Sequence, residues 1–234
     1  HTGSFQIQKG NNLMKNMIHP IFGSLSEEEL EALKMHTRIH EKNIKKNTII
    51  FHFGDLVTET GIVLSGSVHI ETTDFWGNTS LLSNVEAGGV FAETYSLCHE
   101  PMMVDVAAAS DCRILFMDME FLHDPTLSGY SWHQKMLSNM LSISIRKNLT
   151  LSHRIFCTSP KTIRERLLTY LSSQAGKTGS SSFQIPFNRQ QMADYLNLDR
   201  SALSKELGKM RDEGLITFHK NQFTLLHPAL NESH

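Results

Sequence analysis

The sequence predicts an α+β protein with an N-terminal β-domain, one long helix and a C-terminal unit of two short helices and a β-hairpin. Short β-prone runs recur about every ten residues over 39–119, which is typical of a sandwich or jelly roll. Residues 127–156 form the longest helical pattern, and residues 187–215 contain two amphipathic helical patterns separated by a tight break. The expected segments are 13–126, 127–157 and 158–234.

Composition is typical of a globular protein. Of the 234 residues, 40% are hydrophobic and 20% are charged, and the formal net charge is −2. No run approaches the roughly 18 consecutive apolar residues of a membrane-spanning helix, and the polar start lacks the hydrophobic stretch of a signal peptide. Three distant cysteines, Cys98, Cys112 and Cys157, argue against a disulfide framework and fit a reducing compartment. We therefore expect a cytoplasmic protein with no membrane partner.

The N-terminal part is expected to contain one or two short helices in residues 13–36, followed by strands. Ser26 and the three glutamates after it form a capping-box pattern with acidic residues in the first turn. From about Ile39 the apolar residues follow the period of strands, and Gly, Asp, Ser and Asn separate the runs. Residues 88–97 lead from two glycines into a short helical segment, which can expose backbone N–H groups to an anion or simply form a tight turn.

The long helix carries two adjoining apolar rows. One row is Leu137, Leu141, Ile145 and Leu149, and the other is Met136, Met140 and Ile143. An apolar surface this broad must be covered from two sides. The β-domain can cover one side, and the same helix of a second subunit can cover the other, as in a parallel coiled coil; complete burial within one monomer is the alternative. We assign the dimer interface to Met136, Met140, Ile143 and Lys147.

Residues 157–160 are expected to end the long helix and form a hinge at 157–159. Ser159 can cap the next helix, and Pro160 suits its first turn. That helix has an apolar face of Ile163, Leu167, Leu168 and Leu171. Residues 174–182 are expected to form a flexible surface loop, after which 183–186 form a short strand.

The segment 187–215 has the most specific pattern. Its second helix has apolar residues at i, i+4 and i+7, and therefore one buried face: Leu203, Leu207 and Met210. Asn197 tolerates the left-handed backbone of a sharp turn before that helix. Asp199 can cap the helix. Residues 215–218 and 223–226 read as two strands around a turn, in the position of a wing.

The opposite face of this second helix carries two cations and two small hydroxyl groups. Such a face can enter a DNA major groove and contact base edges and phosphates, although an ordinary solvated face is the alternative. Residues 160–234 contain 10 Lys and Arg against 7 Asp and Glu, which is consistent with a polyanionic partner. We expect double-stranded DNA to be contacted by Arg189, Gln190, Arg200, Ser201, Ser204, Lys205 and Lys220.

With these parts in this order, residues 39–226 resemble the cyclic-AMP receptor protein / fumarate–nitrate regulator (Crp/Fnr) family of bacterial transcription regulators. The most specific pieces are Gly54-Asp55, 64–68 (LSGSV), 89–93 (GVFAE) and 188–216. The resemblance implies a cyclic-nucleotide-binding-like β-roll that senses a small effector. It also implies a homodimer, palindromic operator DNA and, for an activator, RNA polymerase as a partner. It places Arg200, Ser201 and Lys205 at base- and phosphate-reading positions.

The expected effector pocket departs from the pattern of relatives that bind cyclic AMP. Those relatives carry an Arg after the Gly-rich turn, and a guanidinium suits the cyclic phosphate. Here the corresponding stretch, 101–105, reads PMMVD and contains no cation. Ala92 replaces the second Gly of the turn, and Glu93 would repel a phosphate. We therefore expect that cyclic AMP does not bind.

Another small molecule is expected in its place. Met102 and Met103 suggest a deformable apolar pocket, although these methionines can equally fill the β-roll without any ligand. By the resemblance, Lys147 and Asn148 of the long helix face this pocket. The expected pocket residues are Gly89, Phe91, Ala92, Glu93, Tyr95, Met102, Met103, Lys147 and Asn148.

Other sensing chemistries and other protein classes have weaker support. An iron–sulfur cluster needs about four thiolates, more than the three cysteines supply. Cys98-His99 leaves haem as an alternative, and the cysteines leave redox sensing as another. The sequence has no phosphate-binding loop, paired metal-ligand spacing or nucleophile signature, so we expect no metal site, no catalytic residues and no enzyme. The remaining competitor is a sensor module of a signalling protein, which would not need the C-terminal helices.

Overall fold

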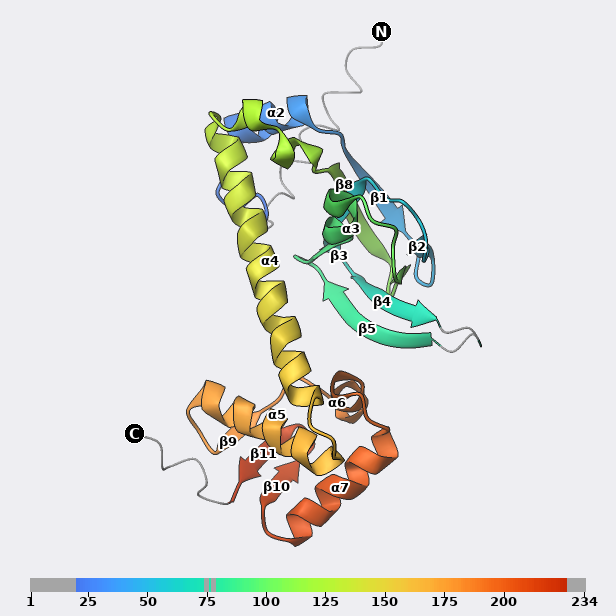
Figure 1. Ribbon diagram of the computed structural model, residues 1–234, viewed down its shortest axis with the longest axis vertical. Helices are drawn as coiled ribbons and strands as arrows, with labels where there is room; N and C mark the ends of the chain where they lie inside the picture. Colours follow the sequence, from blue (N-terminus) through green and yellow to red (C-terminus); the bar gives the residue numbers. More distant parts are fainter. Residues whose placement is uncertain (1–19, 74–75, 77–78, 227–234) are drawn as a thin grey trace. The chain divides into compact units, whose positions relative to one another are not determined.

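The computed structural model describes residues 20–226 except 74, 75, 77 and 78, so the expected structure in 13–19 and 227–234 lies outside the described residues. The chain divides into two compact units, 1–145 and 146–234 (Figure 1). This division falls inside the long helix α4 (Ser131–Thr158) and not at the hinge expected at 157–159. In the described part of the chain, no helix combines the length and hydrophobicity needed to cross a bilayer.

The first helix among the described residues is the short α2 (Glu27–His36). The predicted capping box is confirmed: the Ser26 N–H donates to the Glu29 carboxylate at 2.8 Å, and the Glu29 N–H donates to the Ser26 hydroxyl at 3.2 Å. The acidic residues of the first turn also complement the positive end of the helix dipole.

In the described part of this unit, eight strands follow and form two four-stranded sheets, with orders β1-β8-β3-β6 and β2-β7-β4-β5. Neighbouring strands of the described residues pair antiparallel, as the spaced β-runs predicted. Side chains from both sheets meet in one buried cluster, which includes Val63, Val68, Val106 and Ile114. The strands are β1 (Ile39–Ile44), β2 (Ile49–Phe51), β3 (Glu59–Ser65), β4 (Ser67–Thr73), β5 (Thr79–Glu86), β6 (Val90–Phe91), β7 (Asp105–Ala108) and β8 (Cys112–Asp118).

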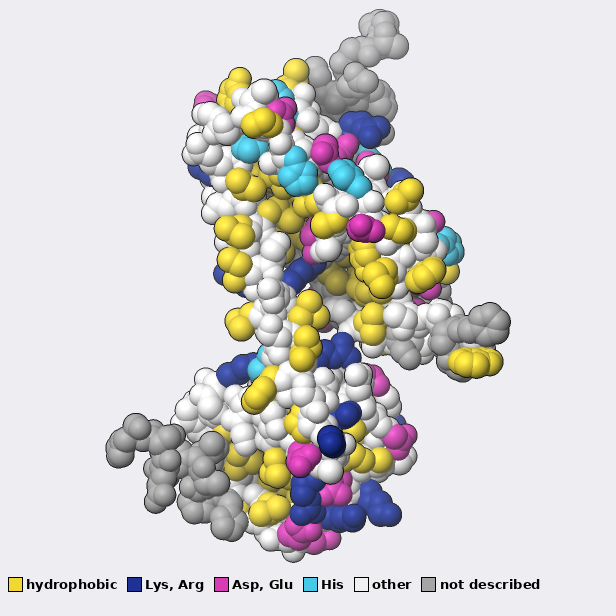
Figure 2. All heavy atoms as spheres, viewed as in Figure 1, with side chains coloured by type: hydrophobic (Ala, Val, Ile, Leu, Met, Phe, Trp, Pro, Cys, Tyr) yellow, Lys and Arg dark blue, Asp and Glu magenta, His cyan; other side chains and the backbone are white. Residues whose placement is uncertain are grey.

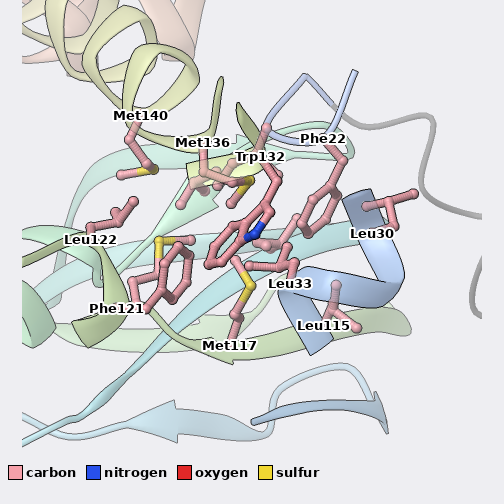
Figure 3. Packing of buried hydrophobic residues seen from close by; sticks show 14 of the residues in the cluster. Phe22, Leu30, Leu33, Leu115, Met117, Phe121, Leu122, Trp132, Met136 and Met140 are labelled. Atoms are coloured by element: carbon pink, nitrogen blue, oxygen red, sulfur yellow. The ribbon is translucent and has the colours of Figure 1, made fainter. Parts of the chain in front are cut away.

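The face of α4 that packs on the β-domain differs from the prediction. Met136 is fully buried and Met140 is 4% exposed, and both belong to the core that also contains α2, β8 and the 3-10 helices Glu120–His123 and Pro125–Leu127. Figure 3 shows both methionines directed into this core, on the same side as Phe121 and Leu122. The partly buried Ile143 packs against the same cluster.

The dimer assignment of Met136 and Met140 is therefore wrong, because their own domain covers them. The other predicted row remains exposed, with exposed fractions from 48% to 70%: Leu137, Leu141, Ile145 and Leu149. Both rows are apolar and adjoin each other, so hydrophobic periodicity alone could not assign one to the monomer core. The short segments around residues 20–36 and 120–127 decide the question by packing on the methionine row.

The second unit combines the end of α4 with three further helices and a three-stranded sheet of order β10-β11-β9. The predicted short strand and wing are confirmed, and the hairpin turn falls at Lys220-Asn221. Five leucines and a tyrosine of the helices lie in its core with Phe183 and Phe223 of the strands. The elements are α5 (Ile163–Thr178), β9 (Ser182–Gln184), α6 (Arg189–Leu196), α7 (Arg200–Asp212), β10 (Ile216–His219) and β11 (Gln222–Leu225).

Two boundaries of α5 correct the prediction. Thr162, not Ser159, is the N-cap, because Thr162 and Glu165 form a capping box of their own. The helix also continues to Thr178, so most of the loop expected at 174–182 is helical. Gly179 ends the helix with a left-handed backbone at φ 63°. Ala175 is buried against the core, which favours the extra turn over a loop.

Candidate nucleic-acid interface

Helices α6 and α7 are joined by a tight turn. The roles predicted for Asn197 in the turn and for Asp199 as the cap of α7 are confirmed. Asn197 has φ 51° and ψ 54°, and its N–H donates to carbonyl groups at the end of α6. Asp199 caps α7 by accepting a hydrogen bond from the Ala202 N–H at 2.8 Å. The cap satisfies one of the free N–H groups of the first turn, which favours a helix start at Arg200.

The buried face of α7 fixes which side chains point outward. Leu203, Leu207 and Met210 are fully buried, as the i, i+4, i+7 spacing predicted. On the outward face, Lys and Arg side chains gather over α7, with acidic side chains beside them (Figure 2). In the part of the chain that the structure describes, four exposed side chains of α7 make no hydrogen bond or ion pair: Arg200, Ser201, Ser204 and Lys205.

Arg164 of α5 holds α7 from its other side. Its guanidinium makes two 2.7 Å hydrogen bonds to the Glu213 carboxylate and one of 2.6 Å to Glu206. The hydrogen bonds from Arg164 hold the pKa of the Glu213 carboxyl below its usual range. This forked contact fixes both the middle and the C-terminal end of α7 against α5.

Two further arginines bind the end of α6. The Arg154 guanidinium, from the last turns of α4, donates to the carbonyl oxygens of Asp194 and Tyr195, both at 3.1 Å. Arg166 of α5 donates to the carbonyl oxygens of Leu196 and Asn197 at 3.2 and 3.1 Å. These carbonyls lie where a helix lacks internal partners and where its dipole favours a cation. Positive side chains of α4 and α5 therefore anchor the first helix of the pair.

The predicted DNA contacts on α6 are already engaged within the unit. The Arg189 guanidinium lies 5.0 Å from the Phe218 ring centroid and 5.6 Å from that of Phe223. It also donates to the Lys220 carbonyl at 3.4 Å, and burial lowers its pKa. Gln190 donates to the Asp194 carboxylate at 2.9 Å. Arg189 therefore ties α6 to the wing.

The wing presents Lys220 at its tip. Lys220 is exposed and has φ 55°, the left-handed conformation of a two-residue hairpin turn between β10 and β11. The predicted residues of the outer face of α7 therefore lie on one surface, whereas Arg189 contacts the wing and Gln190 bonds to Asp194 within α6.

Sequence reasoning missed the positioning residues Arg154, Arg164 and Arg166. Their partners lie 30 to 49 residues away along the chain. A cation near the end of a predicted helix is a weak signal by itself, because most such side chains are simply solvated. The carbonyls and carboxylates that bind these arginines become neighbours only after the unit has folded.

The predicted effector region of the β-roll is closely packed. Phe51, Phe91 and Phe116 have ring centroids 6.0 to 6.4 Å apart and occupy the space between the sheets. A Cβ atom on Gly61 would lie 2.1 Å from the Phe91 ring, so a side chain there would displace this aromatic group. Met102 is 1% exposed and belongs to the same cluster, whereas Met103 is 70% exposed and points away from it.

In the turn before α3 (Glu93–Cys98), an alanine adopts a backbone conformation that is more usual for glycine. Ala92 has φ 63°, a left-handed conformation that costs a residue with a Cβ more than it costs glycine. Ala92 and Glu93 are buried, Tyr95 is half-buried, and Gly89 forms the preceding turn. This part of the predicted pocket is therefore brought together.

The predicted pocket residues of α4 belong to the second unit. Lys147 and Asn148 follow the division after residue 145. Their approach to the β-roll stays a prediction.

The cysteines differ in reactivity. Cys112 and Cys157 are buried, and burial raises the pKa of both thiols, so neither has thiolate character. Cys98 is exposed, next to the exposed His99, whose Nε2 lies 3.5 Å from Glu120. Of the three thiols, Cys98 is therefore the one accessible to a ligand or an oxidant.

Comparisons with known proteins agree with these two units. The cyclic nucleotide-binding domain family matches residues 41–124, and the Crp-like helix-turn-helix domain family matches residues 165–230. Electron transport regulator A of Shewanella oneidensis is 24% identical over 183 residues, which cover 75% of this chain and 70% of that protein.

Solved structures share the fold. A mutant of CooA from Carboxydothermus hydrogenoformans has a TM-score of 0.57 at 18% identity, covering 90% of this chain and 93% of that one. CprK in complex with OCPA has a TM-score of 0.63 at 12% identity, and the match covers 86% of this chain and 90% of that one. The two domain families, in this order and joined by the long helix, show that the chain belongs to the Crp/Fnr family and is a DNA-binding transcription regulator, not an enzyme.

Proposed function

We propose that this regulator binds two-fold-symmetric operator DNA as a homodimer, reads the major groove with α7, and responds to a small molecule other than cyclic AMP in its β-roll. The observation that carries the proposal is the outer face of α7. Four polar side chains there are exposed and make no hydrogen bond or ion pair within the described chain, while the opposite face is fully buried.

The positions of the four side chains along α7 suggest different contacts with phosphates and bases. Arg200 and Ser201 lie in the first turn of α7, where the helix dipole and free N–H groups also favour phosphate. Ser204 and Lys205 lie one turn later. An arginine can bind guanine through two hydrogen bonds, whereas a lysine or serine can serve base or phosphate. We assign Lys220, which is exposed at the tip of the wing, to the DNA backbone beside the groove.

The Arg200→Ala variant tests the reading helix. An operator is first selected from random duplex DNA with the wild-type protein, and affinities are then compared at one fixed salt concentration. We expect a loss of about 1–3 kcal/mol, or roughly 5- to 150-fold. Arg38→Ala is the matched control, because Arg38 is an exposed arginine of the first unit, 3.7 Å from Asp118. Equal affinity of the wild type and Arg200→Ala would refute the assignment.

The dimer contact is proposed along the exposed row of α4. Leu137, Leu141, Ile145 and Leu149 repeat at i, i+4 spacing and leave an apolar strip in water. Burying one such side chain contributes about 1.5–3 kcal/mol of favourable free energy. Pairing with a second α4 would bury the strip and stabilise a dimer. This row replaces the methionine row that the β-domain covers.

The Leu141→Lys variant tests the dimer contact by placing a charge in the strip. Analytical ultracentrifugation is expected to show dimer for the wild type and a shift to monomer for the variant. Leu56→Lys is the control, since Leu56 is also highly exposed but lies in the loop before β3. A monomeric wild type, or a dimer unaffected by Leu141→Lys, would contradict this interface.

The effector is proposed to be less charged than a cyclic nucleotide. Residues 101–105 contain no cation, and Met102 and Phe91 make the surrounding region apolar. Glu93, a buried acidic residue that is only 7% exposed, lies beside the turn. Isothermal calorimetry with cyclic AMP is expected to show no saturable heat; binding in the micromolar range would overturn this part of the proposal.

A further inference from the structure

A pocket of about 350 Å³ lies wholly within the second unit, apart from the β-roll. Its walls come from the last turns of α4, from α5, from α6 and from the connection before α6. The volume is within the range of small-molecule sites, which run from about 300 to 1,000 Å³. The lining residues that define its chemistry are His153, Tyr170, Lys177, Phe187 and Tyr195.

Three aromatic rings give the pocket an apolar wall. Phe187 lies 5.0 Å from Tyr195 and 6.1 Å from Tyr170 between ring centroids, and its plane is within 24° of that of Tyr170. Phe187 and Tyr195 are only half-buried, so part of this surface remains accessible. Offset stacking on such rings favours a planar partner.

One polar group of the pocket lacks a partner. Tyr170 is 1% exposed, and its hydroxyl has no hydrogen bond in the described structure. Burying a hydroxyl without a partner is unfavourable, and most buried polar side-chain atoms in native proteins are paired. The hydroxyl can supply one hydrogen bond to a ligand oxygen that reaches it.

The electrostatic character of the pocket is positive. Lys177 is exposed and has no ion-pair partner in the described chain, and none of the lining residues is acidic. His153 has both ring nitrogens within hydrogen-bonding distance of hydroxyls, Tyr195 at 2.8 Å and Ser173 at 2.9 Å. Burial and the nearby Lys177 charge lower the pKa of His153, so the ring is mainly neutral near pH 7. Lys177 is therefore the charge that an anionic ligand would meet.

We propose that this pocket binds a small planar organic anion of the aromatic carboxylate type. Its ring would lie against Phe187 and Tyr195, and its carboxylate would pair with Lys177. This site belongs to the DNA-binding unit and is separate from the effector region of the β-roll. Its occupancy would reinforce the contact of α4 and α5 with α6, because residues of all three helices line it.

The test uses the full-length protein and three probes: benzoate, 2-naphthoate and indole-3-carboxylate. Saturation-transfer NMR and calorimetry are expected to show saturable binding, with dissociation constants below about 10 mM. The uncharged amides of the same rings are expected to bind more weakly. Lys177→Gln is expected to weaken carboxylate binding about fivefold, as for a partly exposed ion pair.

Lys161→Gln provides the matched control, because Lys161 is exposed, lies just before α5 and does not line the pocket. Circular dichroism confirms that both variants fold before affinities are compared. Absence of saturable binding for all three carboxylates would overturn the proposal. Equal affinity for acids and amides, or equal effects of the two lysine variants, would overturn it as well. Operator binding is measured separately, so a failure here is distinguishable from a failure of the DNA-reading assignment.

Discussion

Replacing Arg154 by methionine tests whether the end of α4 holds the first helix of the DNA-binding pair. The Arg154 guanidinium donates to the carbonyl oxygens of Asp194 and Tyr195, both at 3.1 Å. Methionine keeps a flexible apolar stem but removes the donors and the charge. The carbonyls of the last turn of α6 then lose partners that the helix itself cannot supply.

The expected cost follows from the geometry. A hydrogen bond to a charged group contributes about 1.5–3 kcal/mol when well buried. Arg154 is half-buried, water can reach the released carbonyls, and Arg166 still donates to Leu196 and Asn197. We therefore expect α6 to lose about 2 kcal/mol of local stability, which is roughly a 30-fold rise in its opening equilibrium.

Hydrogen exchange followed by mass spectrometry measures this change directly. Peptides covering 189–196 are expected to exchange about 30-fold faster in Arg154→Met, while peptides from the β-roll are unchanged. Arg146→Met is the matched control, because Arg146 is exposed on the same helix and donates no side-chain hydrogen bond in the described structure. Unchanged protection of α6 in Arg154→Met would refute the anchoring role, and equal effects of both variants would do the same.

Three further variants test other contacts of the second unit. Tyr170→Phe removes a buried hydroxyl without a partner, so calorimetric scanning is expected to show about 1 kcal/mol of added stability, whereas a comparable loss would reveal a hidden hydrogen bond. Asp199→Ala removes the cap of α7 and is expected to cost about 1 kcal/mol in urea unfolding, with Asp199→Ser restoring most of it. Because Arg164 lowers the pKa of Glu213, its ion pair stabilises the fold above the ordinary carboxyl value of 4.5, and this stabilisation is lost as pH falls through the lowered pKa. The stability difference between the wild type and Glu213→Gln should therefore shrink on acidification, and a constant difference would contradict the contact.

Features set by neighbouring residues could be predicted from the sequence. The capping box at Ser26, the left-handed Asn197 and the cap at Asp199 all depend on groups within three or four residues. The strand runs and the buried face of α7 could also be predicted. Hydrophobic residues repeat with a period of two in strands and about 3.6 in helices, and this pattern can be recognised without knowing the rest of the fold. These features were sufficient to identify the two domain types and the outward face of α7.

Features set by distant residues could not be predicted. Two apolar rows share α4, and only the packing of segments far away in sequence shows that Met136 and Met140 belong to the monomer core. Arg189 is a second example. Its positive charge predicted a contact with DNA, but in the folded unit its guanidinium lies over the rings of Phe218 and Phe223 in the wing. Charge and hydrophobicity indicate what a side chain can do, but the tertiary partner decides which role it takes.

The three unpredicted arginines explain how α7 obtains a defined orientation. Arg154 and Arg166 hold the end of α6 and the turn at Asn197, and Arg164 holds α7 through Glu206 and Glu213. The last turns of α4 and helix α5 therefore bind both α6 and α7 through hydrogen bonds. A free joint at residues 157–159 is inconsistent with these contacts, because Arg154 precedes that point and already binds α6. A change in the direction of the last turns of α4 would thus move α6 and α7 together as one body.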